Sequence, residues 1–351
     1  MTDAAYDAVL FVSFGGPEGP EDVMPFLENV LRGKNVPRER MLEVADHYQH
    51  FGGISPINAQ CRELITALQA ELAAHHIDLP IVWGNRNWDP LLPDALQELK
   101  SRGSRRVLAY VTSAFSSYSG CRQYRENIRD AQAAVGAGDM EIHKIRAFYN
   151  HPDFISVHTE LIREAIRELG HSSASAVPAT PPTDFQIAFT AHSIPQSMAD
   201  TSDYEKQLTE SCRLVAESLD VPADGWQLVF QSRSGRPQDP WLEPDINDHL
   251  KRLHTDGVRH VVISPIGFLS DHIEVLYDLD DEARTTATDL GLTMVRAGTP
   301  GSHPTFVSML RKLIQERLSG AVRECVGRYG PNHDTCPVDC CPAPVRPHRP
   351  A

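Results

Sequence analysis

Short apolar runs alternate with helix-like segments along this chain, and the alternation limits the folds open to it. The runs are rich in β-branched and aromatic residues, as buried strands are. Between them, stretches such as 59–74 and 155–169 carry apolar residues three and four positions apart, which predicts amphipathic helices. This pattern predicts an α/β fold with parallel sheets covered by helices on both faces. The predicted strands are residues 7–13, 80–84, 106–112, 142–147, 185–190, 226–231, 259–265 and 292–297.

The segment 171–184 divides the chain into halves of similar size. It is rich in Ser, Ala and Pro and lacks periodicity, which is typical of a linker. At an offset of 154, Gly103-Ser-Arg aligns with Gly257-Val-Arg, and at an offset of 178 the run VLFVSFGGP aligns with IAFTAHSIP. Two related halves explain this similarity, although strand–loop–helix units also share it generically. We expect domains at 1–170 and 185–320, followed by a Cys/Pro-rich tail at 321–351.

Charge and apolar content exclude some classes of function. The 351 residues include 33 Lys and Arg and 47 Asp and Glu, so the net charge is −14. This excess argues against a nucleic-acid binder, which must neutralise phosphates. No apolar stretch approaches the roughly 20 residues of a transmembrane helix, and the first residues do not resemble a signal peptide. We therefore expect a cytoplasmic protein that has neither a transmembrane segment nor a nucleic-acid partner.

Polar side chains follow the predicted strands of the second half. Ligands of open parallel sheets bind beyond the carboxyl ends of the strands, where His192 ends QIAFTAH and Glu274 follows HVVISPIGFL. The spacing places Glu274, Asp278 and either Asp281 or Glu282 on one helical face. A histidine and a line of carboxylates could bind a divalent cation or transfer protons. The alternatives are a structural histidine and acidic residues that complement a helix dipole.

Cysteines are concentrated at the C-terminal end, since four of the seven lie in the last 27 residues. The segment is proline-rich and aperiodic, so composition alone favours a disordered tail. Clustered thiols in a reducing compartment nevertheless suggest metal ligation, by a [2Fe–2S] cluster or by zinc. The spacing favours neither metal group. The tail cysteines are Cys325, Cys336, Cys340 and Cys341.

Several segments resemble the signature motifs of ferrochelatases. They are FGGP at 14–17, HYQHFGGISPIN at 47–58, TAHSIP around His192, QSRSGRPQDPWLEPD at 231–245, and PIGFLSDHIEVLYDLDDE around Glu274. The resemblance extends from residue 7 to about residue 315. It implies the type II chelatase fold, with two similar Rossmann-like domains that each contain a four-stranded parallel sheet flanked by helices.

The resemblance also implies an activity, the insertion of ferrous iron into a porphyrin in haem biosynthesis. His192 would then face the macrocycle as the base or metal ligand, with Glu274 as its acidic partner. Asp278 and Glu282 match the carboxylates that line a path for protons or metal. The alternatives are a chelatase for another metal or tetrapyrrole, and a haem or metal carrier without catalysis.

Further positions implied by the resemblance lie in the first half. Ser55 and Tyr124 match residues that hold the porphyrin propionates. Phe14 stands where ferrochelatases of Gram-positive rods and cocci carry a tyrosine that can ligate iron, and phenylalanine has no donor atom. It can still offer an apolar face to the ring. Phe14 is typical of the actinobacterial branch, whose substrate is coproporphyrin III rather than protoporphyrin IX.

The same resemblance favours a [2Fe–2S] cluster held by three tail cysteines and one from the body of the protein. Cys121, which precedes a predicted helix, is our choice for the internal ligand. We do not expect the adjacent Cys340 and Cys341 both to bind the cluster. The expected substrates are Fe(II) and coproporphyrin III, and a downstream protein would accept the coprohaem product.

Overall fold

The computed structural model describes residues 6–34, 36–172, 185–236 and 238–344, with only the backbone described for 171 and 172. The predicted linker at 171–184 falls almost wholly outside this part of the chain. All eight predicted strands are present, with bounds within three residues of those expected. They are β1 (Ala8–Ser13), β2 (Ile81–Asn85), β3 (Arg106–Val111), β4 (Glu141–Lys144), β5 (Phe185–His192), β6 (Trp226–Gln231), β7 (His260–Ser264) and β8 (Thr293–Arg296).

The strands form two four-stranded parallel sheets with the same order. The first sheet has the strand order β2-β1-β3-β4 and the second has the order β6-β5-β7-β8. Each strand of the second sheet therefore has the same position as the strand numbered four lower in the first. In both sheets the first strand of the half is central and pairs with the second and third strands. The predicted fold class is therefore confirmed, and the repeat found in the sequence corresponds to a repeat in topology.

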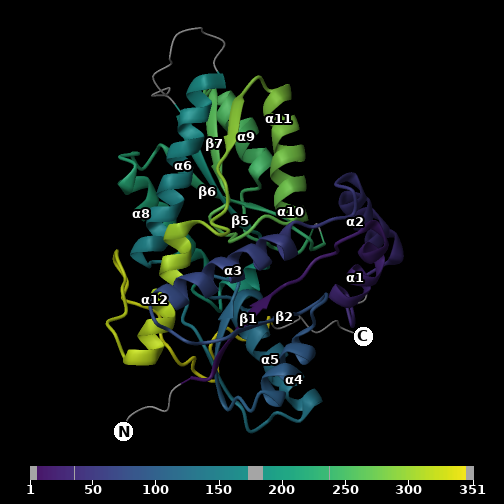
Figure 1. Cartoon of the computed structure of the whole chain (residues 1–351). Coiled ribbons are helices and arrows are strands. Elements are labelled where there is room, and N and C mark those ends of the chain that lie inside the picture. The colour runs from purple at the N-terminus through teal and green to yellow at the C-terminus, as the bar shows by residue number, and fades with distance from the viewer. Residues whose placement is uncertain (1–5, 35, 173–184, 237, 345–351) are drawn as a thin grey trace.

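Alternating residues of the central strands face two different hydrophobic cores. In β1, Leu10 and Val12 pack with α4 (Leu92–Ser101) and α5 (Gln123–Val135), whereas Phe11 faces α3 (Ile57–Ala74). The second sheet packs α9 (Ile246–Thr255) and α11 (Arg284–Asp289) on one face, with α6 (Pro152–Ser172) and α8 (Tyr204–Ser218) on the other (Figure 1). Because both faces are covered, the strands carry almost continuous apolar runs.

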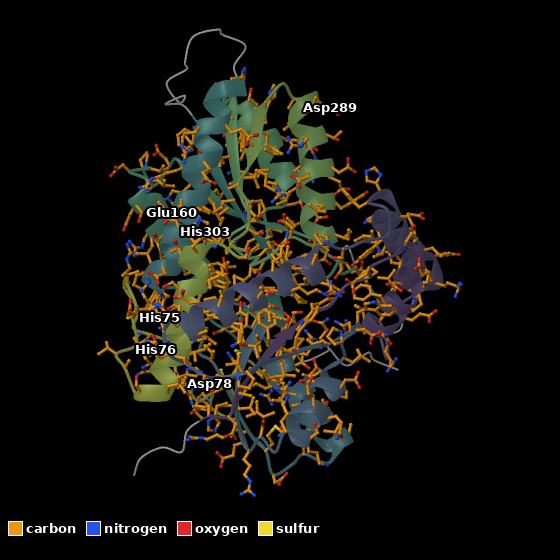
Figure 2. The ribbon with its side chains drawn as sticks, viewed as in Figure 1. His75, His76, Asp78, Glu160, Asp289 and His303 are labelled. Atoms are coloured by element: carbon orange, nitrogen blue, oxygen red, sulfur yellow. The ribbon has the colours of Figure 1, made fainter. Side chains whose placement is uncertain are left out.

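The two halves share one hydrophobic core. It contains Phe11 of β1 and Phe189 of β5 together with residues of α3, α6, α8 and α12 (Pro304–Ser319). Helix α6 precedes the predicted linker yet packs against β7 and β8 of the second sheet, and α12 contacts both α3 and α6. At the start of α12, His303 Nε2 lies 3.5 Å from Glu160 Oε2 of α6 (Figure 2).

Two smaller groups of helices complete the molecule. After the 3₁₀ turn η1 (Pro20–Asp22), helices α1 (Val23–Val30) and α2 (Arg38–His50) pack against each other around Phe26. In the second half the remaining helices are α7 (Gln196–Ala199) and α10 (Ile273–Val275), and each half also contains one π-helix, described below. In the described part of the chain, no helix is long and apolar enough to span a membrane.

The tail contains no helix or strand over residues 321–344, yet it is fixed to the first half by hydrogen bonds. Val326 N donates to Asn150 O at 2.9 Å, and Asn150 Nδ2 donates to Tyr329 O at 2.9 Å. Further along, Arg122 donates to the carbonyls of Val338 and Cys340. Over its described residues the tail therefore does not match the disordered segment that its composition favours, because buried and charged donors of the first half bind its carbonyls.

Candidate active site and thiol cluster

His192 is the last residue of β5, at the carboxyl end of the central strand of the second sheet. Its Nδ1 lies 2.5 Å from Ser193 O, and Tyr204 OH donates to His192 O at 3.0 Å. Because a carbonyl only accepts, Nδ1 carries the hydrogen of the neutral imidazole and Nε2 keeps its lone pair. That nitrogen is then free to accept a proton or to bind a metal.

Glu274 lies opposite this nitrogen. Its Oε2 is 3.8 Å from His192 Nε2 and 3.9 Å from His272 Nδ1. The side chains of His192 and Glu274 are 35% and 50% exposed, so both remain accessible to a ligand. Burial lowers the pKa of His272, which Glu274 partly opposes and His192 reinforces. The predicted pairing of His192 with a carboxylate in the second half is present in the structure.

Asp278 continues the line of carboxylates away from this pair. Its Oδ2 accepts hydrogen bonds from Ser232 Oγ and from Gln231 Nε2, the latter at 3.2 Å. Burial raises the pKa of Asp278 to about 7, with Glu274 and Glu282 raising it further against the hydrogen bonds. Burial also raises the pKa of Glu282, as do Asp245 and Asp281. Carboxyl groups with raised pKa values exchange protons near neutral pH.

The backbone of this segment differs from the α-helix that the spacing predicted. Leu276–Ala283 forms a π-helix, η3, whose wider turn brings residues four apart closer to alignment than residues three apart. Asp278 and Glu282 interact electrostatically, whereas Asp281 Oδ2 lies 3.6 Å from His50 Nε2 of α2. Asp280 instead binds Arg296 at 2.8 Å. Of the two residues left open, Glu282 follows Asp278 and Asp281 turns towards α2.

The corresponding region of the first half holds aromatic rings and a cation. The guanidinium of Arg86 lies 4.6 Å from the centre of the Tyr124 ring and 5.5 Å from that of Phe14. Tyr124, in the first turn of α5, is buried in the core shared with α4, and Ser55 is buried beside Gly16. Sequence reasoning missed Arg86. Its place directly after β2, at a strand's carboxyl end, was the available signal.

Helix α2 contacts η3 across the two halves. The rings of His47 and Tyr277 stack with centroids 3.7 Å apart and planes at 8°. Together with the His50–Asp281 pair, this stack joins the α1–α2 helices to the element that carries the acidic residues. The contact could not be predicted from the sequence, because nothing local to either segment indicates the other.

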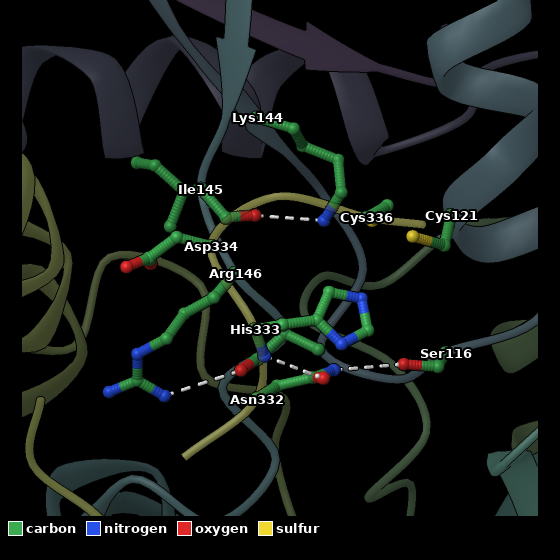
Figure 3. Close-up of a pocket in the computed structure, with 10 residues that line it drawn as sticks. Ser116, Cys121, Lys144, Ile145, Arg146, Asn332, His333, Asp334 and Cys336 are labelled. Atoms are coloured by element: carbon green, nitrogen blue, oxygen red, sulfur yellow. Dashed lines mark hydrogen bonds between the residues drawn. The ribbon is translucent and has the colours of Figure 1, made fainter. Parts of the chain in front are cut away.

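Four cysteines meet at the second π-helix, η2 (Tyr118–Arg122), which carries Cys121. Hydrogen bonds with Cys336 and then Cys341 hold the pKa of Cys121 well below its usual range, with Lys144 and Arg125 adding positive charge. Cys340 Sγ lies 3.6 Å from Cys341 Sγ. Figure 3 shows Cys121, Cys336 and Lys144 around a small pocket.

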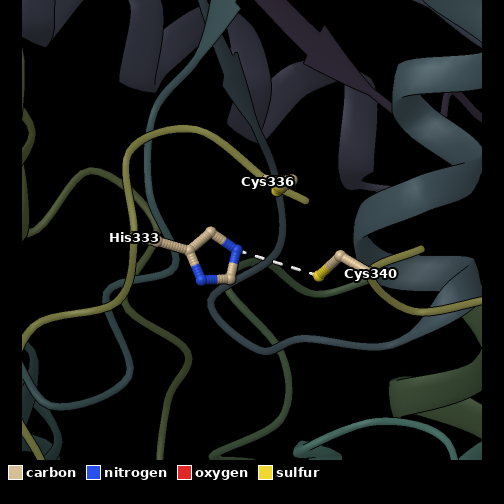
Figure 4. A group of neighbouring side chains, drawn as sticks. All are labelled: His333, Cys336 and Cys340. Atoms are coloured by element: carbon tan, nitrogen blue, oxygen red, sulfur yellow. Dashed lines mark hydrogen bonds between the residues drawn. The ribbon is translucent and has the colours of Figure 1, made fainter. Parts of the chain in front are cut away.

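The grouping differs in part from the set offered by the sequence. Cys325 lies instead near Tyr149, whose pKa is raised first by burial and also by the charge of Cys325. Cys340 and Cys341 both lie at the cluster, although their adjacency suggested that only one would. His333, which the sequence did not single out, joins Cys336 and Cys340 within 4.8 Å (Figure 4).

Comparisons with known proteins show the family to which this chain belongs. The Ferrochelatase family model matches residues 6–318. A protein of Rhodopirellula baltica named "Ferrochelatase" is 55% identical over 96% of this chain and 93% of its own length. A "Coproporphyrin III ferrochelatase" of Streptomyces griseus is 47% identical over 97% of this chain and 94% of its own. Among solved structures, SirB from Bacillus subtilis with Fe3+ has a similar fold.

That SirB structure aligns with a TM-score of 0.55 at 13% identity, covering 90% of this chain and 96% of the other. At this identity the similarity concerns the fold alone. The family match covers both sheets and includes His192, Glu274 and the acidic π-helix. The chain belongs to the ferrochelatase family.

Proposed function

We propose that this protein inserts ferrous iron into coproporphyrin III and releases coprohaem and two pyrrole protons, as a step of haem biosynthesis. The observation that carries the proposal is the His192–Glu274 pair, whose nearest side-chain atoms are 3.8 Å apart and accessible at the end of β5. Relatives from Streptomyces griseus and Streptomyces coelicolor are named for this porphyrin, and they support the substrate assignment.

The chemistry needs a base, an acidic partner and a route for protons. In this proposal His192 Nε2 takes a pyrrole proton, because its Nδ1 hydrogen is held by Ser193 O. Glu274 stabilises the imidazolium that forms and approaches the incoming cation from the same side. Asp278 and Glu282 then carry protons or metal along η3, since the pKa of Asp278 is about 7, which suits proton exchange near neutrality, and that of Glu282 is raised in the same direction.

The anionic edge of the porphyrin would face the first half. Arg86 supplies positive charge between Phe14 and Tyr124, and Phe14 offers an apolar face to the ring. Direct contacts from Ser55 and Tyr124 to the propionates stay a prediction, because both side chains are buried in the structure without ligand. Coproporphyrin III carries more propionates than protoporphyrin IX, so a cationic edge favours the former.

An anaerobic assay with Fe(II) tests the substrate assignment. We expect conversion of coproporphyrin III, followed by its Soret shift, with a higher kcat/KM than protoporphyrin IX. A preference for protoporphyrin IX would overturn the coproporphyrin assignment but leave the family activity. Turnover with cobalt and not iron would favour another metallochelatase, and stoichiometric uptake of preformed haem without turnover would favour a carrier.

The thiol cluster fits a [2Fe–2S] group. Cys121, Cys336, Cys340 and Cys341 supply four thiols, and Lys144 with Arg125 offsets the negative charge that four thiolates bring. A cluster here would anchor the tail to η2. Zinc also accepts four thiolates and is the alternative metal. All seven cysteines are free thiols, which suits a reducing cytoplasm, the location that we propose.

The visible spectrum separates these two metal assignments. We expect the protein as isolated to absorb between roughly 320 and 460 nm, where thiolate-ligated iron–sulfur centres absorb. Cys336→Ser should lose this absorbance, whereas Cys325→Ser, a control outside the cluster, should keep it. A colourless protein that binds one zinc ion per chain would overturn the iron–sulfur assignment. A downstream acceptor would be identified as a protein that binds the coprohaem product.

A further inference from the structure

His333 is a fifth donor beside the four thiols. Its Nε2 lies 3.8 Å from Cys340 Sγ, and its ring points towards that sulfur in Figure 4. The ligand atoms of His333, Cys336 and Cys340 all lie within 4.8 Å of one another. The proposed function gives this residue no role.

The four sulfurs would fill the four ligand positions of a [2Fe–2S] cluster. Cys121 contacts Cys336 and Cys341, and Cys341 contacts Cys340 at 3.6 Å. His333 Nε2 lies 3.8 Å from Cys340 Sγ, and Cys336 Sγ lies within 4.8 Å of the ligand atoms of both residues. With four thiolates available, the imidazole is left to interact with a sulfur rather than with iron.

The position of His333 is fixed by hydrogen bonds of the neighbouring residue. His333 N donates to Asn332 Oδ1 at 2.9 Å, and Asn332 Nδ2 donates to Ser116 Oγ at 3.1 Å. Ser116 is itself held by Gln207, whose Oε1 accepts from Ser116 N at 2.8 Å. The imidazole therefore approaches Cys340 from a segment that is anchored to both halves of the molecule.

We infer that His333 donates its Nε2 hydrogen to the Cys340 thiolate and thereby raises the reduction potential of the cluster. Reduction adds negative charge to the iron–sulfur unit, and a hydrogen bond to a ligand sulfur stabilises the more negative state. The inference rests on the cofactor part of the proposed function. Iron insertion itself transfers no electron, so the potential can change while the rate of insertion does not.

A dithionite titration of the purified full-length protein at one fixed pH tests the inference. His333→Phe keeps the ring volume, and hence the shielding of the cluster, but removes the donor. We expect this variant to keep its iron and sulfide content while its midpoint potential shifts downward. His333→Gln restores an N–H and should recover at least part of the shift. Visible absorbance and the EPR signal of the reduced protein report the potential.

Other results would contradict either the His333–Cys340 hydrogen bond or the cofactor assignment. An unchanged potential in His333→Phe, with a full cluster, overturns the hydrogen bond. If His333→Phe loses iron and sulfide or has an altered EPR signal, and Cys340→Ala shows neither change, then His333 is a ligand of the cluster. That result also overturns the hydrogen bond. Wild-type protein without iron–sulfur absorbance contradicts the cofactor assignment itself, which is a separate failure.

Discussion

The carboxyl group of Asp278 is placed so that it can change protonation near neutral pH. Burial and the neighbouring Glu274 and Glu282 raise its pKa to about 7, while Gln231 and Ser232 donate hydrogen bonds that favour its ionised form. The two donors come from the end of β6 and the residue after it, whereas Asp278 lies in η3. Asp278 lies four residues beyond Glu274, so a carboxyl group that exchanges protons near neutral pH stands next to the proposed site.

The raised pKa of Asp278 makes a stability prediction for Asp278→Asn. In the unfolded chain the carboxyl ionises near pH 3.8, but in the folded protein it does so near 7. Wild-type protein therefore loses stability as pH rises from about 4 to about 7, because only the unfolded state releases its proton in that window. The Asn variant has no such loss. Its advantage in melting temperature should grow over this window and stay constant above it.

Thermal melts at several pH values measure that difference. A difference that is flat between pH 4 and 7 would contradict the raised pKa. Glu282→Gln is the matched comparison, since the pKa of Glu282 is raised in the same direction and its variant should likewise gain melting temperature relative to wild type as pH rises.

Functional side chains that directly follow a strand could be predicted from the sequence. Side chains whose role depends on contacts with distant parts of the chain could not. His192 and Glu274 were predictable because the carboxyl ends of parallel strands meet at one edge. Arg86 and His333 were not, since Arg86 acquires its position from the rings of Phe14 and Tyr124. His333 becomes significant only where the tail passes η2.

Two π-helices lie at corresponding places in the two halves. η2 follows β3 and carries Cys121, and η3 follows β7 and carries Asp278. The offset of 154 that relates the halves places Gly120 opposite Glu274 and Tyr124 opposite Asp278. The same local geometry thus serves a thiol cluster in one half and a carboxylate line in the other. Spacings of three and four could not reveal this, because α- and π-turns differ in backbone hydrogen bonding.

Deleting Asp281 tests whether the π-helix sets the line of carboxylates. The shorter segment should return to α-helical hydrogen bonding, so Glu282, then three residues from Asp278, would be displaced around the helix axis relative to Asp278 while Glu274 keeps its place. We expect the rate of iron insertion to fall roughly 10- to 100-fold, the scale of a misplaced group. Asp281→Asn keeps the length and should keep the rate. A deletion variant that folds, by circular dichroism, and turns over like wild type would contradict this role.

The tail is the segment whose structure differs most from what its composition predicts. Its prolines and lack of periodicity favour disorder, but its carbonyls accept hydrogen bonds from Arg122, Arg146 and Asn150. These donors lie in the first half, far from the tail in sequence. A local pattern cannot show that partners at such distance are available, which is why the order of residues 321–344 was not predictable.

At the scale of the whole molecule, a buried ion pair joins the first sheet to the last helix. Arg146 follows β4 and binds Glu316 of α12 through two hydrogen bonds of 2.8 and 2.9 Å, with both side chains at most 4% exposed. Arg146 also donates to Glu324 O in the tail. The eight strands and their order in two sheets followed from the sequence pattern, but this shared interior did not, since it depends on how α12 packs on α3 and α6.

Removing one member of this pair should be costly. Glu316→Gln leaves the Arg146 guanidinium buried without its counter-charge, and breaking such a pair costs about 3–5 kcal/mol. Urea unfolding should show a loss of that size. The double variant Arg146→Met with Glu316→Leu should recover most of it, because no charge then remains buried. A single variant as stable as wild type would show that the pair does not hold the halves together.

The central claim is that His192 and Glu274 form the site of iron insertion. The most direct measurement is an anaerobic single-turnover reaction of coproporphyrin III with Fe(II), for wild type and His192→Ala, alongside porphyrin binding by fluorescence. We expect conversion by wild type and normal porphyrin binding by His192→Ala. Insertion by the variant should be at least roughly 100-fold slower, as expected for loss of a positioned base. No conversion by wild type, or undiminished conversion by His192→Ala, would contradict the central claim.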